Sequence, residues 1–225
     1  MLSLLLLGFL LGLRHATDPD HVVAVTTIVT RERRLWSSSV IGAFWGLGHT
    51  ATVVLLGGAI ILCDVAIPPR LGLGLEAAVA LMLVALGVAN LTGLLGRAHR
   101  AVEGAIAPAH VGPRGPIGLR PLLIGLVHGL AGSAAVALLV LATIHDRREA
   151  LLYLGVFCLG TIAGMVALTT ALGLPFAYAS RRLPRVQGWL AGATGLLSVG
   201  MGIVLVYQLT VVGGLLTGTP QWTPQ

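Results

Sequence analysis

Six long apolar runs, separated by short gaps that contain arginine, constrain this chain more than any other feature of its sequence. A helix needs roughly 20 apolar residues to cross a bilayer, and each run is long enough. Only 10% of the 225 residues are charged, against about 25% in soluble domains, so the polar side chains are too few to coat a water-exposed surface. The sequence therefore predicts an all-α, polytopic membrane protein with six transmembrane helices. They are predicted at about residues 2–29, 37–62, 74–96, 119–144, 150–176 and 187–213.

Arginine is distributed unevenly between the two predicted sides of the membrane. The connections after the first, third and fifth runs hold ten arginines. The opposite side holds three, Arg70, Arg147 and Arg148. Because positive residues stay on the cytoplasmic side, we predict extracytoplasmic termini for a multi-pass protein of the prokaryotic cell (inner) membrane. The net charge of +6 is explained by this orientation in a lipid bilayer, and it does not indicate a nucleic-acid partner.

The two halves of the chain resemble each other. The segment L-L-G-L-R-H-A at Leu10–Ala16 parallels L-I-G-L-V-H-G at Leu123–Gly129, and Ile41–Gly48 parallels Leu154–Gly160. Since each half has three spans, the second half must be inverted, and inverted repeats are typical of transporters with a substrate site near the midplane. We predict a first three-helix repeat with the metal motif, a cytoplasmic linker, a second three-helix repeat and an extracytoplasmic tail over 1–96, 97–118, 119–213 and 214–225.

The first run contains a cluster of ionisable side chains near its middle. Each such group costs about 2.5–3.5 kcal/mol in a membrane span, so it persists only where function or pairing requires it. On a continuous helix His15, Asp18 and His21 fall within about 120° of one another, whereas Asp20 points elsewhere. Pro19 is expected to kink this helix, and the kink could bring Asp20 toward the same cavity.

Two further histidines lie in the middle of other runs. His49 is in the second run and His128 in the fourth, each beside glycines that allow helices to approach closely. Imidazole suits nickel, copper, zinc and iron, and carboxylates balance the charge of a divalent ion. The sequence therefore predicts one shared site for a divalent transition-metal ion. Its predicted ligands are His15, Asp18, Asp20, His21, His49 and His128.

A structural ion-pair network, for example between Arg14 and Asp18, is the alternative explanation of the cluster. A network built only for stability rarely offsets the cost of its desolvation, so we favour the metal site. The remaining histidines, His99, His110 and His145, lie in the predicted connections, and no role is predicted for them.

The first half resembles a known family of transporters. The segment R-H-A-T-D-P-D-H-V (Arg14–Val22) contains the pattern H-x4-D-H, which resembles the signature of the nickel/cobalt transporter family. The G-H-T at Gly48–Thr50 is similar to the second motif of that family. In the family these histidines and aspartates are implicated in metal selection and transport. The resemblance implies the same role in this chain for His15, Asp18, Asp20, His21 and His49.

The second half departs from the larger members of the family. H-G-L-A-G-S-A-A stands at His128–Ala135, and Thr169 and Leu172 occupy positions where larger members have acidic residues. The six predicted spans and this motif are more similar to the short urease-accessory nickel permeases. The resemblance implies a permease for Ni²⁺ or Co²⁺ and leaves the choice of metal and the direction open. It also implies that urease or hydrogenase maturation proteins are partners.

Neither an enzymatic activity nor a resident cofactor is predicted for this chain. The sequence has no G-x-x-x-x-G-K-[ST] motif, so ATP coupling would require another chain. One alternative is a non-transporting membrane subunit or metal chaperone for urease or hydrogenase assembly. A membrane thiol-disulfide oxidoreductase is a weaker alternative, because Cys63 and Cys158 do not lie in a C-x-x-C motif.

Overall fold

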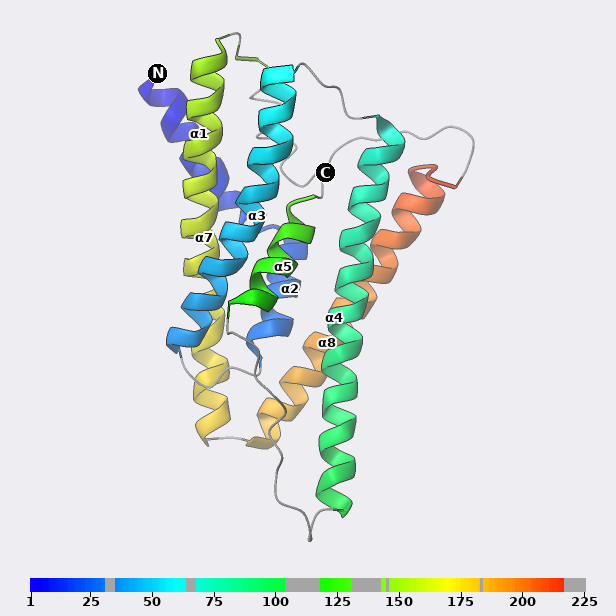
Figure 1. The fold of residues 1–225 in the computed structure, drawn as a ribbon. Helices are drawn as coiled ribbons and strands as arrows, with labels where there is room; N and C mark the ends of the chain where they lie inside the picture. Colours follow the sequence, from blue (N-terminus) through cyan, green and yellow to red (C-terminus); the bar gives the residue numbers. More distant parts are fainter. Residues whose placement is uncertain are drawn as a thin grey trace.

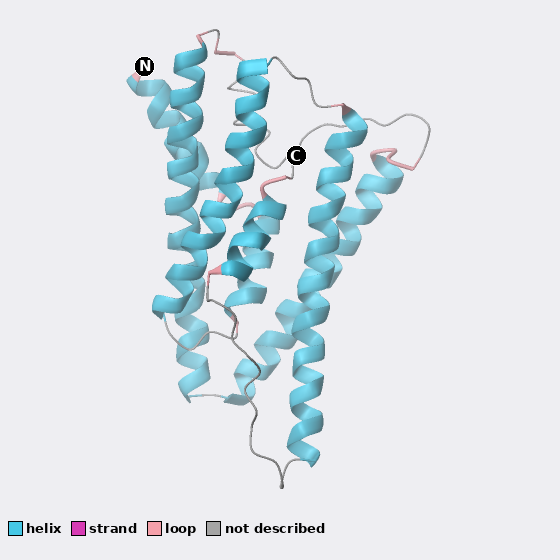
Figure 2. Ribbon diagram, viewed as in Figure 1, coloured by secondary structure: helices cyan, strands magenta, loops and turns pink. Residues whose placement is uncertain are grey.

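The computed structural model describes residues 1–30, 35–63, 68–103, 118–130, 143–144, 146–182 and 184–216. Within these ranges the chain forms helices and short connections, and it contains no strand (Figure 2). The predicted all-α class is confirmed for this part of the chain. The elements are α1 (Leu2–His15), α2 (Pro19–Val29), α3 (Leu35–Cys63), α4 (Pro69–Glu103), α5 (Leu119–His128), α7 (Arg147–Arg182), α8 (Pro184–Tyr207) and a short π-helical segment, η2 (Gln208–Val212).

Four of the described helices are long and apolar enough to cross a membrane. In a bilayer the backbone groups must be bonded within the segment, which a continuous apolar helix achieves. The sequence predicts six spans, and four candidates are found among the described residues, at the second, third, fifth and sixth predicted runs. They are Leu35–Cys63, Pro69–Gly93, Arg147–Tyr178 and Val186–Val212.

The first predicted run is not a single kinked helix. α1 ends at His15, the Asp18 N–H donates to the His15 carbonyl oxygen at 3.1 Å, and α2 then begins at Pro19. A proline at the first position of a helix removes no intrahelical hydrogen bond, so Pro19 starts α2 instead of bending one long helix. The prediction of one helix over 2–29 is therefore wrong. With 14 residues in α1 and 11 in α2, neither helix crosses a bilayer alone.

The fourth predicted run, 119–144, begins as a helix at Leu119, and α5 ends after 10 residues at His128. The N–H of Gly129 donates to the Gly125 carbonyl oxygen at 2.8 Å and ends the last turn. Residues 131–142 of this predicted run lie outside the described part of the chain. α1 and α5 therefore both end at a histidine partway through a predicted span.

The connection between the fourth and fifth predicted runs, residues 145–149, contains the start of α7. The Asp146 Oδ1 atom accepts hydrogen bonds from the backbone N–H groups of Arg148 at 2.8 Å and Glu149 at 3.0 Å. This side-chain cap satisfies N–H groups that would otherwise lack partners at a helix start. α7 therefore begins at Arg147, three residues before the predicted start of the fifth helix at about residue 150.

The helices pack as two connected groups (Figure 1). α3 and α7 pack along each other, α1 packs on α7, and α5 packs on α3. α4 and α8 form the second pair, and α2 contacts α4, α7 and α8. Since α2 follows directly from α1 and contacts both groups, its first turn lies where the two groups meet.

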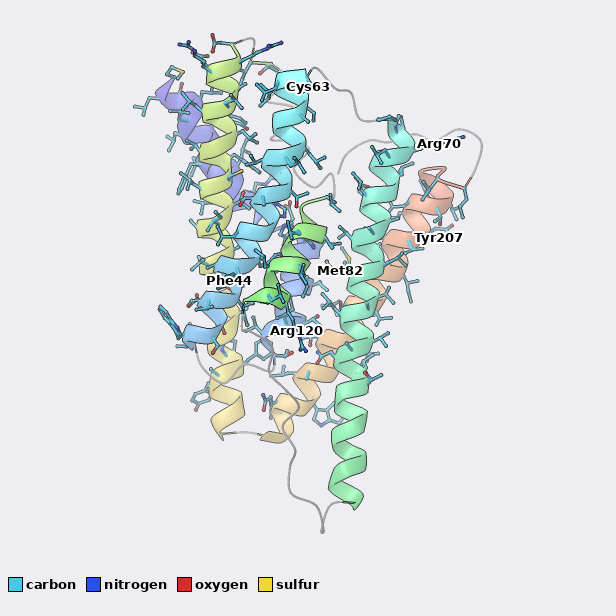
Figure 3. The ribbon with its side chains drawn as sticks, in the orientation of Figure 1. Phe44, Cys63, Arg70, Met82, Arg120 and Tyr207 are labelled. Atoms are coloured by element: carbon cyan, nitrogen blue, oxygen red, sulfur yellow. The ribbon has the colours of Figure 1, made fainter. Side chains whose placement is uncertain are left out.

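The outward faces of these helices are apolar, which fits a lipid environment. Large apolar side chains such as Leu55 and Leu196 are 70% and 65% exposed, and side chains project outward along the long helices in Figure 3. In a soluble protein such extended apolar surface would need a partner. Inside, Trp45, Tyr153 and Phe157 are almost fully buried.

Candidate metal centre

Four histidines meet where two short helices end inside the bundle. His15 is the last residue of α1, His128 is the last residue of α5, and His21 is in the first turn of α2. His49 comes from the middle of α3. Their exposed fractions are between 0% and 5%. Burial of four imidazoles together in an apolar bundle is costly unless they are hydrogen-bonded or bind an ion.

The first group consists of His15, His21 and His49, which can each offer a ligand atom within 4.8 Å of the others. His15 Nε2 and His49 Nε2 are 3.0 Å apart. The ring centroid of His21 is 4.6 Å from that of His15 and 5.2 Å from that of His49. Asp18 Oδ2 lies 2.9 Å from His15 Nδ1 and orients this ring from its other edge.

The second group consists of Asp20, His21 and His128, with ligand atoms within the same limit. Asp20 Oδ1 is 3.0 Å from His21 Nδ1, and Asp20 Oδ2 is 3.0 Å from His128 Nε2. His128 Nε2 is also 3.2 Å from His21 Nδ1. The carboxylate therefore contacts one ring nitrogen of each histidine in the group.

All six predicted ligand residues belong to one connected network in the structure. On a continuous helix Asp20 would point elsewhere, and a break between α1 and α2 at Pro19, in place of the predicted kink, brings it into the cluster. Asp18 pairs with His15, whereas the Arg14 residue is exposed, so the alternative Arg14–Asp18 network is not what organises the cluster. That these residues bind a metal stays a prediction.

The two carboxylates decide which ring nitrogens carry hydrogen. An ionised carboxylate only accepts hydrogen bonds, so neutral His15 and His21 donate from Nδ1 and neutral His128 donates from Nε2. Lone pairs then remain on His15 Nε2, His21 Nε2 and His128 Nδ1. Among the described residues, His21 Nε2, His49 Nδ1 and His128 Nδ1 are buried without a hydrogen-bond partner. The arrangement thus offers several imidazole lone pairs in one buried place.

Two aromatic residues of the site were not among the predicted site residues. Trp45 is fully buried, stacks on His21 with ring centroids 5.8 Å apart and planes at 13°, and meets the His128 ring edge-on at 5.5 Å. Phe157 lies 5.6 Å from the His15 ring. Trp45 precedes His49 by four residues on α3, and this same-face spacing was the available signal in the sequence.

Glycines bring the histidine-bearing helices close together. A Cβ atom at Gly125 of α5 would meet the carbonyl oxygen of Trp45 and lie 3.0 Å from the His49 N atom. At Gly129 a Cβ would lie 2.5 Å from the His49 carbonyl oxygen. Small residues allow such backbone contacts between membrane helices, and here they place His128 beside α3.

Asn90, Cys63 and Cys158 have no contact with this network among the contacts described. Asn90 Nδ2 donates to the Ala191 carbonyl oxygen at 3.0 Å and ties α4 to α8. Cys63 is exposed at the end of α3, Cys158 is buried in an apolar cluster, and both are free thiols. No feature of the described residues favours thiol–disulfide chemistry.

Comparisons with known proteins give one match over nearly the whole chain. The chain is 39% identical over 222 residues to the urease accessory protein UreH from Bacillus sp. (strain TB-90), covering 96% of this chain and 95% of that protein. It is 24% identical over 204 and 210 residues to the chloroplast proteins FOR GROWTH AND FERTILITY 2 and 1 from Arabidopsis thaliana. These matches cover 88% of this chain and 55% and 57% of the plant proteins. No protein-family model and no solved structure matches the chain.

Proposed function

The chain belongs to the family of the urease accessory protein UreH, and from this premise we propose that it is a membrane permease for a divalent transition-metal ion, nickel or cobalt. The observation that carries the proposal is the cluster of four buried imidazoles where α1, α2 and α5 begin or end within the bundle. The name of the relative links it to urease, and the resemblance to the short urease-accessory nickel permeases favours nickel.

The proposed cargo fits the donor atoms of the cluster. His15 Nε2 and His49 Nε2 are 3.0 Å apart, close to the spacing of two adjacent nitrogens that bind one ion at about 2.1 Å. Asp18 and Asp20 each hold the Nδ1 edge of a histidine. In metal sites such carboxylates orient the ring and raise its basicity. We therefore assign Asp18 to positioning His15, while Asp20 has oxygens near both His21 and His128.

The carboxyl ends of α1 and α5 add negative potential at the same place, and together with the Asp20 carboxylate they outweigh the positive amino end of α2. The carboxyl end of a helix carries about half a unit of negative charge. α1 and α5 run in opposite directions in Figure 1, and their last residues, His15 and His128, both contact His21. Interrupted helices whose ends face an ion near the midplane are typical of secondary transporters. A cation is favoured between these two ends.

We propose two inverted repeats because equivalent helices make equivalent contacts. α1 packs on α7 and its sequence counterpart α5 packs on α3. A Cβ at Gly12 of α1 would meet the carbonyl oxygen of Phe157, and a Cβ at Gly125 of α5 would meet that of Trp45. The histidine that ends each short helix also contacts that aromatic residue. The ring centroids of His15 and Phe157 are 5.6 Å apart, and those of His128 and Trp45 are 5.5 Å apart.

This symmetry supports six spans, with α1 and α2 as one broken span and α5 as the start of another. Cys63 and Arg70 lie at one end of the bundle and Arg120 lies nearer the other in Figure 3. Because the predicted arginine-rich connections are on the Arg120 side, we propose that this side is cytoplasmic and that both termini are extracytoplasmic.

A non-transporting role is the second candidate, because the relative is named an accessory protein. A membrane subunit or metal chaperone for urease or hydrogenase assembly would bind the ion in the same cluster without moving it across the bilayer. The two roles differ in one measurable property, which is flux.

Uptake of radiolabelled Ni²⁺ and Co²⁺ into proteoliposomes tests the proposal. Wild type is compared with His15→Ala, His21→Ala and His49→Ala, and His145→Ala, a histidine in a predicted connection, is the matched control. We expect wild-type and control flux to be equal and flux in the three cluster variants to fall at least about tenfold. Equal flux in all five proteins would refute the site, and absent flux in folded wild type that still binds metal would favour the accessory role.

A further inference from the structure

The four histidines of the cluster form two pairs instead of one ring of ligands. His15 and His49 face each other at 3.0 Å, and His21 and His128 face each other at 3.2 Å. His49 and His128 are the most separated of the rings in contact, with centroids 6.2 Å apart. Among the described residues, no group of potential ligands within 4.8 Å contains both His49 and His128.

His21 is the one residue that belongs to both groups. Its ring lies 4.6 Å from that of His15 and 4.2 Å from that of His128. Its Nδ1 atom faces Asp20 and His128, whereas its Nε2 atom is buried and has no hydrogen-bond partner among the described residues. Because the two nitrogens lie on different edges of the imidazole ring, His21 can hold an ion on either edge without turning over. An ion on the Asp20 edge takes the place of the hydrogens that His21 Nδ1 and His128 Nε2 otherwise donate to Asp20, and the ring protons move to His21 Nε2 and His128 Nδ1.

We infer that the permeating ion has two adjacent positions that share His21, and that it passes from one to the other during transport. One position is formed by His15, His21 and His49, and the other by Asp20, His21 and His128. This inference rests on the proposed permease function and adds the second position and the shared ligand.

Trp45 keeps the shared ring in a fixed plane. It stacks on His21 with 13° between the planes and meets His128 edge-on at 84°. A ring held between these aromatic surfaces and the Asp20 carboxylate stays in place while the ion changes sides. The fixed element is therefore the ligand, and the moving element is the ion.

The two positions differ in charge and in the half of the protein that completes them. Among the described residues, the first position has three imidazoles as metal ligands and no carboxylate, whereas the second includes the Asp20 carboxylate. The first is completed by His15 of α1, and the second by His128 of α5, the sequence counterpart of α1. Since both need His21, one ion fills one position at a time. Several weak positions in series let an ion enter and leave again.

Cobalt binding to the full-length chain in lipid nanodiscs tests this inference. Co²⁺ is the probe, because its visible absorption reports its ligands, and calorimetry gives its affinity. His49→Gln removes a ligand of the first position only, His128→Gln of the second only, and His21→Gln of both, with His145→Gln as the matched control. The same proteins are assayed for Co²⁺ uptake in proteoliposomes.

We expect His49→Gln and His128→Gln to bind one Co²⁺ each, with affinities within about tenfold of wild type and with different absorption spectra. His21→Gln is expected to weaken binding by about 100-fold or more. Uptake should fall at least about tenfold in all three variants and remain at the wild-type rate in the control. If His128→Gln does not fold, His128→Asn provides the same comparison.

A single shared site would give a different result. If His49→Gln and His128→Gln weaken binding as strongly as His21→Gln, or if their bound Co²⁺ has the same spectrum, the two-position inference is overturned while the permease function stands. Unchanged uptake by His128→Gln would overturn it as well. Absent binding and uptake in wild type would instead overturn the proposed function itself.

Discussion

Adding one methyl group at Gly125 should displace His128 without altering any proposed ligand. In Gly125→Ala the new Cβ would meet the Trp45 carbonyl oxygen and lie 2.6 Å from Trp45 Cδ1 and 3.0 Å from the His49 N atom. Ordinary contact begins at 3.4 Å, and two of these three atoms belong to the backbone of α3. α5 must therefore move away from α3 by about 1 Å.

The energetic consequence follows from two opposing effects. Alanine favours a helix over glycine by about 1 kcal/mol, whereas overpacking costs about 1–3 kcal/mol and is largest where the backbone resists. We expect the free energy of unfolding of Gly125→Ala to fall by up to about 2 kcal/mol. Because His128 is three residues further along α5, metal affinity should also fall, by no more than the tenfold or so expected when His128 itself is removed.

Gly155→Ala in α7 is the matched control, since a Cβ there would meet nothing within 4 Å. It should unfold with an unchanged or slightly raised free energy and bind metal like wild type. Thermal unfolding in detergent followed by circular dichroism, with Co²⁺ calorimetry, measures both quantities. If Gly125→Ala matched Gly155→Ala in stability and affinity, the close α3–α5 contact and its role in placing His128 would be refuted.

Substitutions at three further residues separate positioning, packing and stability. Asp18→Asn should weaken metal binding by up to about tenfold in calorimetry, because the carboxylate orients His15 of the first position only; unchanged affinity would contradict this role. Trp45→Ala should cost about 3–5 kcal/mol of unfolding free energy, whereas Trp45→Phe keeps the surface against His21 and should bind metal within about threefold of wild type; a larger loss with phenylalanine would show that the indole itself is required. Ser198→Ala removes a 2.7 Å hydrogen bond to the backbone of α4 and should lower stability by about 0.5–1.5 kcal/mol with unchanged uptake; reduced uptake in the folded variant would place this contact in transport.

The long helices could be predicted from hydropathy, because an apolar run of sufficient length has few alternatives to a helix. The second run was predicted over 37–62, and α3 spans Leu35–Cys63. The start of α7 at Arg147 was less predictable. It lies in polar sequence, where the local cap Asp146 decides the boundary.

The break in the first run could not be predicted from the same signal. Pro19 is compatible both with a kink and with the start of a new helix, and tertiary contacts distinguish the two. The sequence did predict that His15, His49 and His128 approach each other, and the structure brings them into one cluster. Asp20 was predicted to reach the cluster through a kink at Pro19, and it reaches the cluster through a break between two helices instead.

The contribution of Trp45 was missed for a physical reason. A tryptophan in a membrane protein is usually found near the interface, and the sequence did not reveal that this one is fully buried between His21 and His128. The i,i+4 spacing to His49 was visible, but its meaning depended on where α2 and α5 end.

If the chain is a nickel permease, the buried imidazole cluster is where it holds the ion. X-ray absorption at the nickel edge reports the ligands of that bound Ni²⁺ directly. For the Ni²⁺-loaded full chain in nanodiscs, we predict nitrogen and oxygen ligands at about 2.1 Å with outer-shell scattering from two or more imidazoles. That scattering should be lost in His21→Ala and retained in His145→Ala. Sulfur ligands at about 2.3 Å, or an oxygen-only shell that is the same in both variants, would contradict a histidine-held ion.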